Sequence, residues 1–184
     1  MSNVLFDALF ADHIGSDAPF LILPDGDVWS YQRFLETAAQ YAHVLEALGL
    51  EVGDRLAVQV QKSPEALATY AACLQAGVIF LPLNTAYTAR EMAYFIENSG
   101  AKLVLCDAKA ETALRPVAQA QLQVLNGDGS GSFTRLAMHH PKSYQPRARS
   151  GADLAAFLYT SGTTGLSKGA MLSHDNLLSN AKAL

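Results

Sequence analysis

The sequence predicts an α/β fold in which a mostly parallel sheet is flanked by helices. Between residues 55 and 120, short apolar runs typical of strands alternate with helical patterns of about 10–15 residues. Half of the 184 residues are apolar and 16% are charged, so the chain can bury a core. Successive strand and helix units of this kind form right-handed βαβ crossovers, with helices covering both faces of the sheet.

The first 50 residues predict a helix, a hairpin and a second helix. Residues 3–14 place apolar side chains at helical spacing. The pair Asp25-Gly26 lies between two apolar runs and supplies the positive φ that a tight hairpin turn needs. Ser30 can accept a hydrogen bond at the start of a helix that runs to about Leu48.

Helix-start signals and strand-like runs alternate through the rest of the chain. Ser63 and Pro64 begin a helix that ends at Gly77, because Ser caps a helix and Pro fits its first position. Thr88 and Glu91 form a capping-box pattern at the start of another helix. The predicted strands are 55–60, 78–83, 102–106, 154–159 and 170–172, and the predicted helices are 64–76, 88–100, 108–120 and one that begins after Ser173.

Residues 126–152 are predicted to form a linker-like segment. They begin with the Gly- and Ser-rich stretch NGDGSGS at 126–132. Residues 129–152 contain no acidic side chain but four cationic ones, Arg135, Lys142, Arg147 and Arg149. We interpret this part as a solvated connector, with contact to a bound anion as the alternative.

Composition excludes several classes of protein. Thirteen Lys and Arg against seventeen Asp and Glu give a net charge of −4, which argues against nucleic-acid binding. No apolar run reaches the ~18 residues of a membrane-spanning helix. No Lys or Arg precedes Arg33, so a signal or transit peptide is not expected. We therefore expect a cytoplasmic protein.

The segment most informative about chemistry is YTSGTTGLSKGA, residues 159–170. Its glycines let the backbone approach an anion, and Lys168 is the only charged side chain between Ala155 and His174. A loop of N–H and O–H donors with one cation and no acid suits a polyphosphate, and we expect it at the tip of a hairpin between two buried strands. The predicted ligands are Thr160, Ser161, Gly162, Thr163, Thr164, Gly165, Ser167 and Lys168.

Other phosphate-loop patterns do not fit this segment. A Walker A loop needs Gly before its Lys and Ser or Thr after it, whereas here Ser167 precedes Lys168 and Gly169 follows. This context disfavours a P-loop kinase. The stretch GDGSG at 127–131 resembles the Rossmann fingerprint only superficially. Composition alone leaves a flexible Ser/Gly loop without a ligand as the alternative.

The cysteines and histidines are predicted to have structural roles. Cys73 and Cys106 lie in apolar surroundings without local positive charge, so we expect buried thiols rather than nucleophiles. His139 and His140 are adjacent, and metal binding by them is an alternative that lacks an evident third ligand. His174 is expected to help start the last helix.

The segment 159–170, followed by Met171-Leu172-Ser173-His174, resembles the signature of adenylate-forming enzymes. This family includes acyl-CoA synthetases, luciferases and peptide-synthetase adenylation domains. Further stretches resemble family motifs, so that the resemblance covers about residues 4–184; they are WSY at 29–31, the run 49–58, LQAG at 74–77 and FLPLN at 80–84. The stretches 61–65, 82–88 and 172–176 resemble the malonyl-CoA synthetases within the family.

The resemblance implies a two-step ligase reaction. A carboxylate attacks the α-phosphorus of ATP to give an acyl-adenylate and pyrophosphate, and the CoA thiolate then displaces AMP. The implied cofactors and substrates are ATP, Mg²⁺ and CoA, with malonate as the favoured acid. Lys168 would be the catalytic cation, holding the β- and γ-phosphates together with the hydroxyls and N–H groups of residues 160–167. The alternative anion for residues 129–152 is then a CoA phosphate.

The family members are more than twice as long as this chain. Their motifs for adenine, ribose, Mg²⁺ and the acyl group, and their C-terminal catalytic domain, would lie beyond residue 184. We therefore expect residues 1–184 to be an incomplete N-terminal part of the large adenylation domain, inactive as a ligase by itself. One alternative is a truncated, non-catalytic product that acts as a binding or interaction module. Among enzymes, an adenylate-forming enzyme for another carboxylic acid, a luciferase-like oxidation and a carrier protein as the acceptor also stay open.

Overall fold

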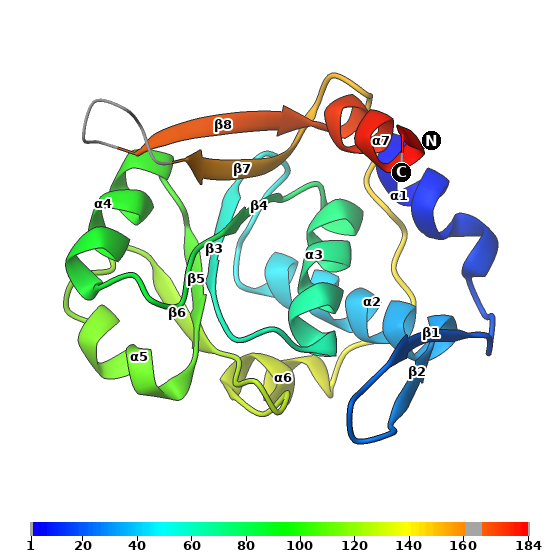
Figure 1. The fold of residues 1–184 in the computed structure, drawn as a ribbon, viewed down its shortest axis with the longest axis horizontal. Helices are drawn as coiled ribbons and strands as arrows, with labels where there is room; N and C mark the ends of the chain where they lie inside the picture. Colours follow the sequence, from blue (N-terminus) through cyan, green and yellow to red (C-terminus); the bar gives the residue numbers. More distant parts are fainter. Residues whose placement is uncertain (1, 161–166, 184) are drawn as a thin grey trace.

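Among the residues that the structure, a computed structural model, describes (2–160 and 167–183), six strands form one sheet (Figure 1). The strand order is β6-β5-β3-β4-β7-β8. Strands β3 to β7 run parallel, and β8 pairs antiparallel with β7 at one edge. This confirms the predicted α/β fold. The strands are β3 (Arg55–Gln59), β4 (Ile79–Pro82), β5 (Leu103–Cys106), β6 (Gln121–Val124), β7 (Leu154–Thr160) and β8 (Lys168–Ser173).

Helices cover both faces of the sheet, as the alternation of strands and helices predicts. Because side chains alternate along a strand, Leu56 and Val58 of β3 join the core beneath α2, α3 and α6, whereas Ala57 packs with Met92 and Phe95 of α4 on the other face. The helices are α1 (Val4–Phe10), α2 (Tyr31–Ala47), α3 (Pro64–Ala76), α4 (Ala89–Ser99), α5 (Ala108–Leu114), α6 (Ser132–Ala137) and α7 (His174–Ala183).

The predicted helix caps are formed. Ser30 Oγ accepts a hydrogen bond from the Arg33 N–H at 3.2 Å, which satisfies one of the donors left free at the start of α2. Thr88 and Glu91 make both hydrogen bonds of a capping box at the start of α4. Gly100 ends α4 with φ of +64°, a left-handed conformation that favours glycine.

The N-terminal hairpin also follows the sequence signals. Strands β1 (Pro19–Ile22) and β2 (Val28–Ser30) pair antiparallel on either side of the Asp25-Gly26 turn, and Trp29 is buried. The helix predicted over residues 3–14 is shorter, because α1 gives way to a 3₁₀ turn at Ala11–His13. Helix α7 packs beside α1 on the outer side of the molecule (Figure 1).

The helix predicted over residues 108–120 ends early. Helix α5 stops at Leu114 because proline at position 116 lacks an N–H donor and disfavours helical geometry in the residue before it. The chain then forms β6, which extends the parallel sheet alongside β5 and was not predicted. In β6, Leu122 and Val124 alternate with two glutamines, a strand pattern too short to stand out beside the helical one.

Residues 126–152 are not a continuous linker. Residues 132–137 form α6, and Phe133 is fully buried with its ring 4.7 Å from that of Tyr41 on α2. The Tyr41 hydroxyl also lies 3.1 Å from the Thr134 hydroxyl oxygen, within hydrogen-bonding distance. The expectation of a solvated connector is therefore wrong for this part of the segment, which contributes to the core.

Two of the cationic residues that follow α6 are ion-paired with helix α2. Lys142 Nζ lies 2.9 Å from a Glu36 carboxylate oxygen, and Arg147 pairs with Glu46. Hydrogen bonds from Gln32 and Lys142 hold the pKa of Glu36 below its ordinary value. These two cations therefore attach the segment to the domain, which leaves less charge for the alternative of anion binding.

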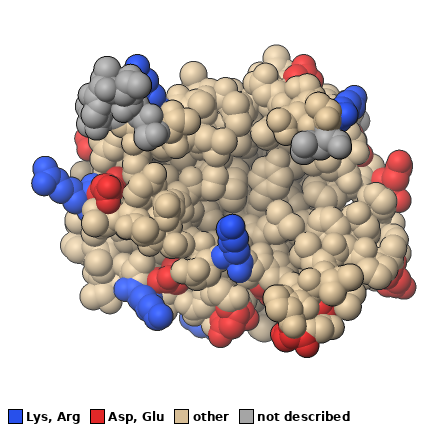
Figure 2. Space-filling model, in the orientation of Figure 1, with Lys and Arg blue, Asp and Glu red and all other residues tan. Residues whose placement is uncertain are grey.

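Charge is distributed sparsely on the surface. On the face in Figure 2, Lys and Arg side chains lie singly and are interspersed with acidic ones, without a basic patch. This distribution agrees with the net charge of −4. None of the described helices combines the length and apolar character needed to cross a bilayer.

Replacing Phe133 tests whether α6 belongs to the core. We expect Phe133→Ala to lower the free energy of unfolding by about 3–5 kcal/mol, the usual cost of emptying a buried aromatic site. Urea unfolding followed by circular dichroism measures this change. Leu136→Ala on the same helix is the control, because Leu136 is 41% exposed and should cost less than about 1 kcal/mol. Equal, small effects of both substitutions would contradict a core role for α6.

Candidate functional site

The candidate site lies at the tip of the β7–β8 hairpin. The two strands pair through Leu158↔Ala170, Tyr159↔Gly169 and Thr160↔Lys168, and the last of these pairs lies next to the loop. This confirms the predicted strand–loop–strand arrangement. Strand β8 begins at Lys168 and ends at Ser173, so it is longer than the predicted 170–172.

Three of the eight predicted ligands belong to the described residues. Thr160, Ser167 and Lys168 lie together where the two strands meet the loop. The Thr160 hydroxyl donates a hydrogen bond to the Lys168 carbonyl oxygen at 3.3 Å, which links the two strands at this point. The other five predicted ligands, Ser161, Gly162, Thr163, Thr164 and Gly165, lie outside the described residues.

Lys168 supplies the positive charge of the site. Its side chain is exposed, and none of the ion pairs between described residues includes it. An exposed ammonium group can bind an anion such as a phosphate, which offers it both negative charge and acceptor oxygens.

The expectation that both strands are buried is wrong for β8. It is the last strand of the sheet, and its residues are exposed or half-buried, with Met171 63% exposed. Of the two hairpin strands, only β7 contains fully buried residues, which are Ala155 and Ala156. An edge strand has one neighbouring strand instead of two. The apolar residues of β8 predict a strand but do not indicate that it lies at the edge of the sheet.

Glycine at position 169 is needed for close packing within the hairpin. The Phe157 ring on β7 lies directly over Gly169 on β8, and a Cβ atom at position 169 would come within 2.2 Å of this ring. The Phe157 ring in turn packs edge-on against Tyr159 at 5.1 Å. Gly169 therefore lets an aromatic side chain cover the strand next to Lys168.

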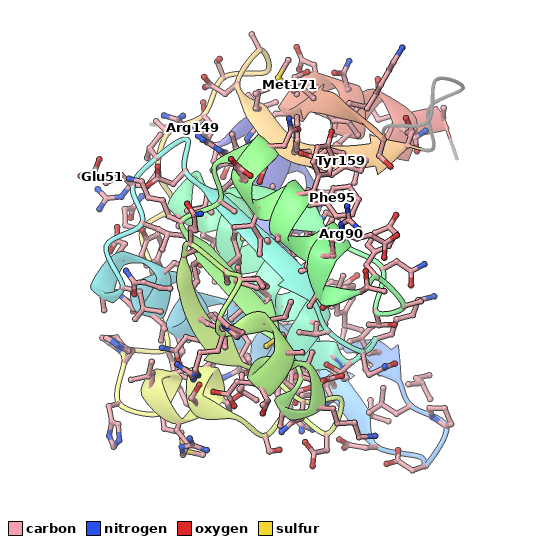
Figure 3. All side chains as sticks on the ribbon, turned by 90° about the vertical axis from the view of Figure 1, so that its left-hand side faces the viewer. Glu51, Arg90, Phe95, Arg149, Tyr159 and Met171 are labelled. Carbon is pink, nitrogen blue, oxygen red and sulfur yellow. The ribbon has the colours of Figure 1, made fainter. Side chains whose placement is uncertain are left out.

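Helix α4 contacts both ends of the loop. The Tyr159 hydroxyl donates a hydrogen bond to Asn98 Oδ1 at 2.6 Å, and the Tyr94 hydroxyl donates one to the Ser167 carbonyl oxygen at 3.4 Å. Figure 3 shows Tyr159 against Phe95 of the same helix; their ring centroids are 4.4 Å apart. Burial raises the pKa of Tyr159 to about 12, so its hydroxyl stays protonated near neutral pH.

These contacts were not predicted from the sequence. Tyr94 and Asn98 are four positions apart and therefore share one face of a helix, a spacing that indicates a common partner. Nothing in the local pattern identifies that partner as the loop, because Ser167 lies 73 positions further along the chain.

The cysteines are buried, as predicted. Cys73 and Cys106 are inaccessible to solvent. Burial raises the pKa of both thiols, that of Cys106 to about 12. A thiol that stays protonated near neutral pH is a poor nucleophile, so both side chains act as small apolar groups.

The histidines form no metal cluster in the described parts of the chain, residues 2–160 and 167–183. His140 stacks with His43 at 5.7 Å between ring centroids. His174 begins α7, as predicted, and its backbone N–H donates to the Asp153 carbonyl oxygen. Burial lowers the pKa of His174 below its ordinary value, which keeps the ring neutral.

The fold defines an α/β protein with a mostly parallel sheet and an antiparallel hairpin at one edge, and comparison with known proteins identifies the family. The family model described as AMP-binding enzyme matches residues 11–184. The chain belongs to this family, and its fold matches the N-terminal part of the adenylate-forming enzymes.

Solved structures of MatB from Rhodopseudomonas palustris are similar over the whole chain. The apo form is 44% identical with a TM-score of 0.95, and the ATP-bound form is 45% identical with a TM-score of 0.94. Each comparison covers 100% of this chain and 37% of the MatB chain. Tyrocidine synthase 2 from Brevibacillus parabrevis is 35% identical over 79% of this chain, which corresponds to 4% of that protein. The chain thus spans well under half the length of these relatives.

The packing of Phe157 over Gly169 can be tested by adding one methyl group. We expect Gly169→Ala to lower the free energy of unfolding by about 1–3 kcal/mol, because the new Cβ forces the Phe157 ring to move. Thermal unfolding measures the effect. The double variant Gly169→Ala with Phe157→Leu should lose less than the two single variants summed, because the smaller side chain makes room. Strict additivity would show that the two residues do not compete for the same space.

Proposed function

We propose that this chain forms the ATP-phosphate-binding part of an acid–CoA ligase that makes an acyl-adenylate and then an acyl-CoA, with malonate as the favoured acid. The β7–β8 hairpin would hold the β- and γ-phosphates of ATP. The observation that carries the proposal is the pairing of Thr160 with Lys168 at the end of the β7–β8 ladder, which places the exposed Lys168 next to the loop.

The relatives support both the nucleotide and the acid. MatB is a malonyl-CoA synthetase, and one of its structures, 45% identical to this chain, contains ATP. The similarity covers all of the β7–β8 hairpin. Because the chain spans 37% of the MatB chain, the reaction as a whole is assigned to a longer protein that contains these residues.

The chemical task of the hairpin follows from electrostatics. A carboxylate must approach the α-phosphorus of ATP although both groups are negatively charged. The Lys168 ammonium and the loop donors would withdraw charge from the β- and γ-phosphates, which lowers the repulsion and stabilises the leaving pyrophosphate. The carboxylate oxygen then forms a bond to the α-phosphorus as the bond to pyrophosphate breaks. In the second step the CoA thiolate attacks the acyl carbon and AMP leaves.

Mg²⁺ and CoA are proposed substrates or cofactors of the longer protein. The described residues bring together no group of three or more His, Cys, Asp or Glu side chains. In nucleotide sites Mg²⁺ is usually held by one or two carboxylates together with the phosphates of the substrate. We assign the ion to the ATP that it accompanies. Lys142 and Arg147, two cations of the segment considered for CoA phosphate, are already paired with glutamates.

Removing the Lys168 ammonium group tests the assigned role. In the complete protein that contains these residues, we expect Lys168→Ala to slow ATP–pyrophosphate exchange about 10-fold or more, the range for losing one charge-stabilising contact. Lys109→Ala, an exposed lysine on α5, is the matched control and should leave exchange unchanged. Unchanged exchange in Lys168→Ala would exclude the proposed role of this side chain.

The substrate is tested with a panel of mono- and dicarboxylic acids in the same exchange assay. We expect malonate to give the highest kcat/KM, because a site built for a second carboxylate leaves polar groups unpaired when an acid lacks it. A higher kcat/KM with another acid would exclude malonate as the favoured substrate and would still support an acid–CoA ligase. Absence of exchange with every acid would favour the non-catalytic binding module. The isolated 184-residue chain is the control, and we expect it to form no AMP from any acid.

A further inference from the structure

Both ends of the β7–β8 loop are hydrogen-bonded to one helix. At the N-terminal end, Tyr159 donates to Asn98 Oδ1 at 2.6 Å. At the C-terminal end, the Ser167 carbonyl oxygen accepts from the Tyr94 hydroxyl at 3.4 Å. Tyr94 and Asn98 lie one turn apart on α4, so a single helix face holds the two strands at the point where they separate.

Helix α4 is itself firmly held. Its first turn carries the complete capping box of Thr88 and Glu91, and Met92 and Phe95 are buried against the sheet. The Phe95 ring packs on Tyr159 at 4.4 Å and on Tyr94 at 5.4 Å, as part of one aromatic cluster (Figure 3). A hydroxyl carried by such a helix has little freedom, so its hydrogen bond can define the position of its acceptor.

The acceptor of the Tyr94 bond is the peptide group that leads into Lys168. The Ser167 carbonyl and the Lys168 N–H belong to the same planar unit, so holding the carbonyl also sets the direction of that N–H. The next peptide is held too, because the Lys168 carbonyl accepts from the Thr160 hydroxyl at 3.3 Å. The backbone of Lys168 is therefore constrained on both sides of its Cα atom.

We propose that Tyr94 is a positioning residue for the phosphate loop: its hydroxyl holds the Ser167–Lys168 peptide so that the Lys168 N–H and side chain meet the terminal phosphates of ATP. This inference rests on the proposed function of the hairpin. It goes further by assigning a role in ATP binding to a residue outside the loop, 73 positions before Ser167.

The positioning role predicts a selective effect on the binding of nucleotides that carry β- and γ-phosphates. AMP lacks both of them, so a change in how Lys168 is held affects ATP and leaves AMP unaffected. General destabilisation of the domain would affect both nucleotides. The ratio of the two affinities therefore separates positioning from a purely structural role.

The test is Tyr94→Phe in the complete protein, which removes the hydroxyl and keeps the ring in its aromatic cluster. We expect the KM for ATP in pyrophosphate exchange to rise about 2- to 10-fold, as for the loss of one hydrogen bond, while the inhibition constant of AMP and the melting temperature stay unchanged. Tyr70→Phe is the matched control. Tyr70 packs on Phe80 at 5.3 Å, and in the described part of the chain its hydroxyl makes no hydrogen bond, so no change is expected.

Lys168→Ala measured in parallel distinguishes a failure of the proposed hairpin function from a failure of the Tyr94 positioning role. If Lys168→Ala changes neither the rate of pyrophosphate exchange nor the KM for ATP, the proposed function of the hairpin fails, and the inference fails with it. If Lys168→Ala raises this KM and Tyr94→Phe behaves like Tyr70→Phe, the positioning role alone is wrong. A loss of ATP and AMP affinity to the same extent in Tyr94→Phe would likewise overturn it.

Discussion

The antiparallel pairing of β8 with β7 is the constraint on which the candidate site depends. Strand β7 is joined to the parallel sheet through β4 and carries the buried residues Ala155 and Ala156, so it has a fixed position. Strand β8 has no other neighbour in the sheet of described strands and takes its position from this ladder. The pair Thr160↔Lys168 is the last step of the ladder before the loop of the proposed phosphate site.

A hairpin at the edge of a sheet needs support, because one ladder of hydrogen bonds allows twisting and sliding. Two kinds of contact supply it here. The Phe157 ring covers Gly169 within the hairpin, and the aromatic and hydroxyl groups of α4 hold its open end.

Local signals predicted most of the fold. The caps at Ser30 and Thr88 depend on residues three positions away, so the sequence alone identifies them, and the period-2 pattern of β3 separates two cores. The sequence did not predict that Phe133 is buried in α6 or that β8 is exposed. Both depend on which segment lies opposite, and in the case of Phe133 that is a residue more than ninety positions earlier, Tyr41.

For the site, the amino-acid sequence by itself determined which side chains are available: the order of Gly, Ser, Thr and Lys in residues 159–170 predicts a polyphosphate loop, and the sequence places the chain in the AMP-binding enzyme family. Only the tertiary structure decided how that loop is held. The hydrogen bond from Tyr94 to Ser167 joins residues 73 positions apart, and such a contact exists only once the sheet has brought α4 and the hairpin together. The chemistry of a side chain is set by its residue type, whereas the position of that side chain is set by the packing of the whole chain.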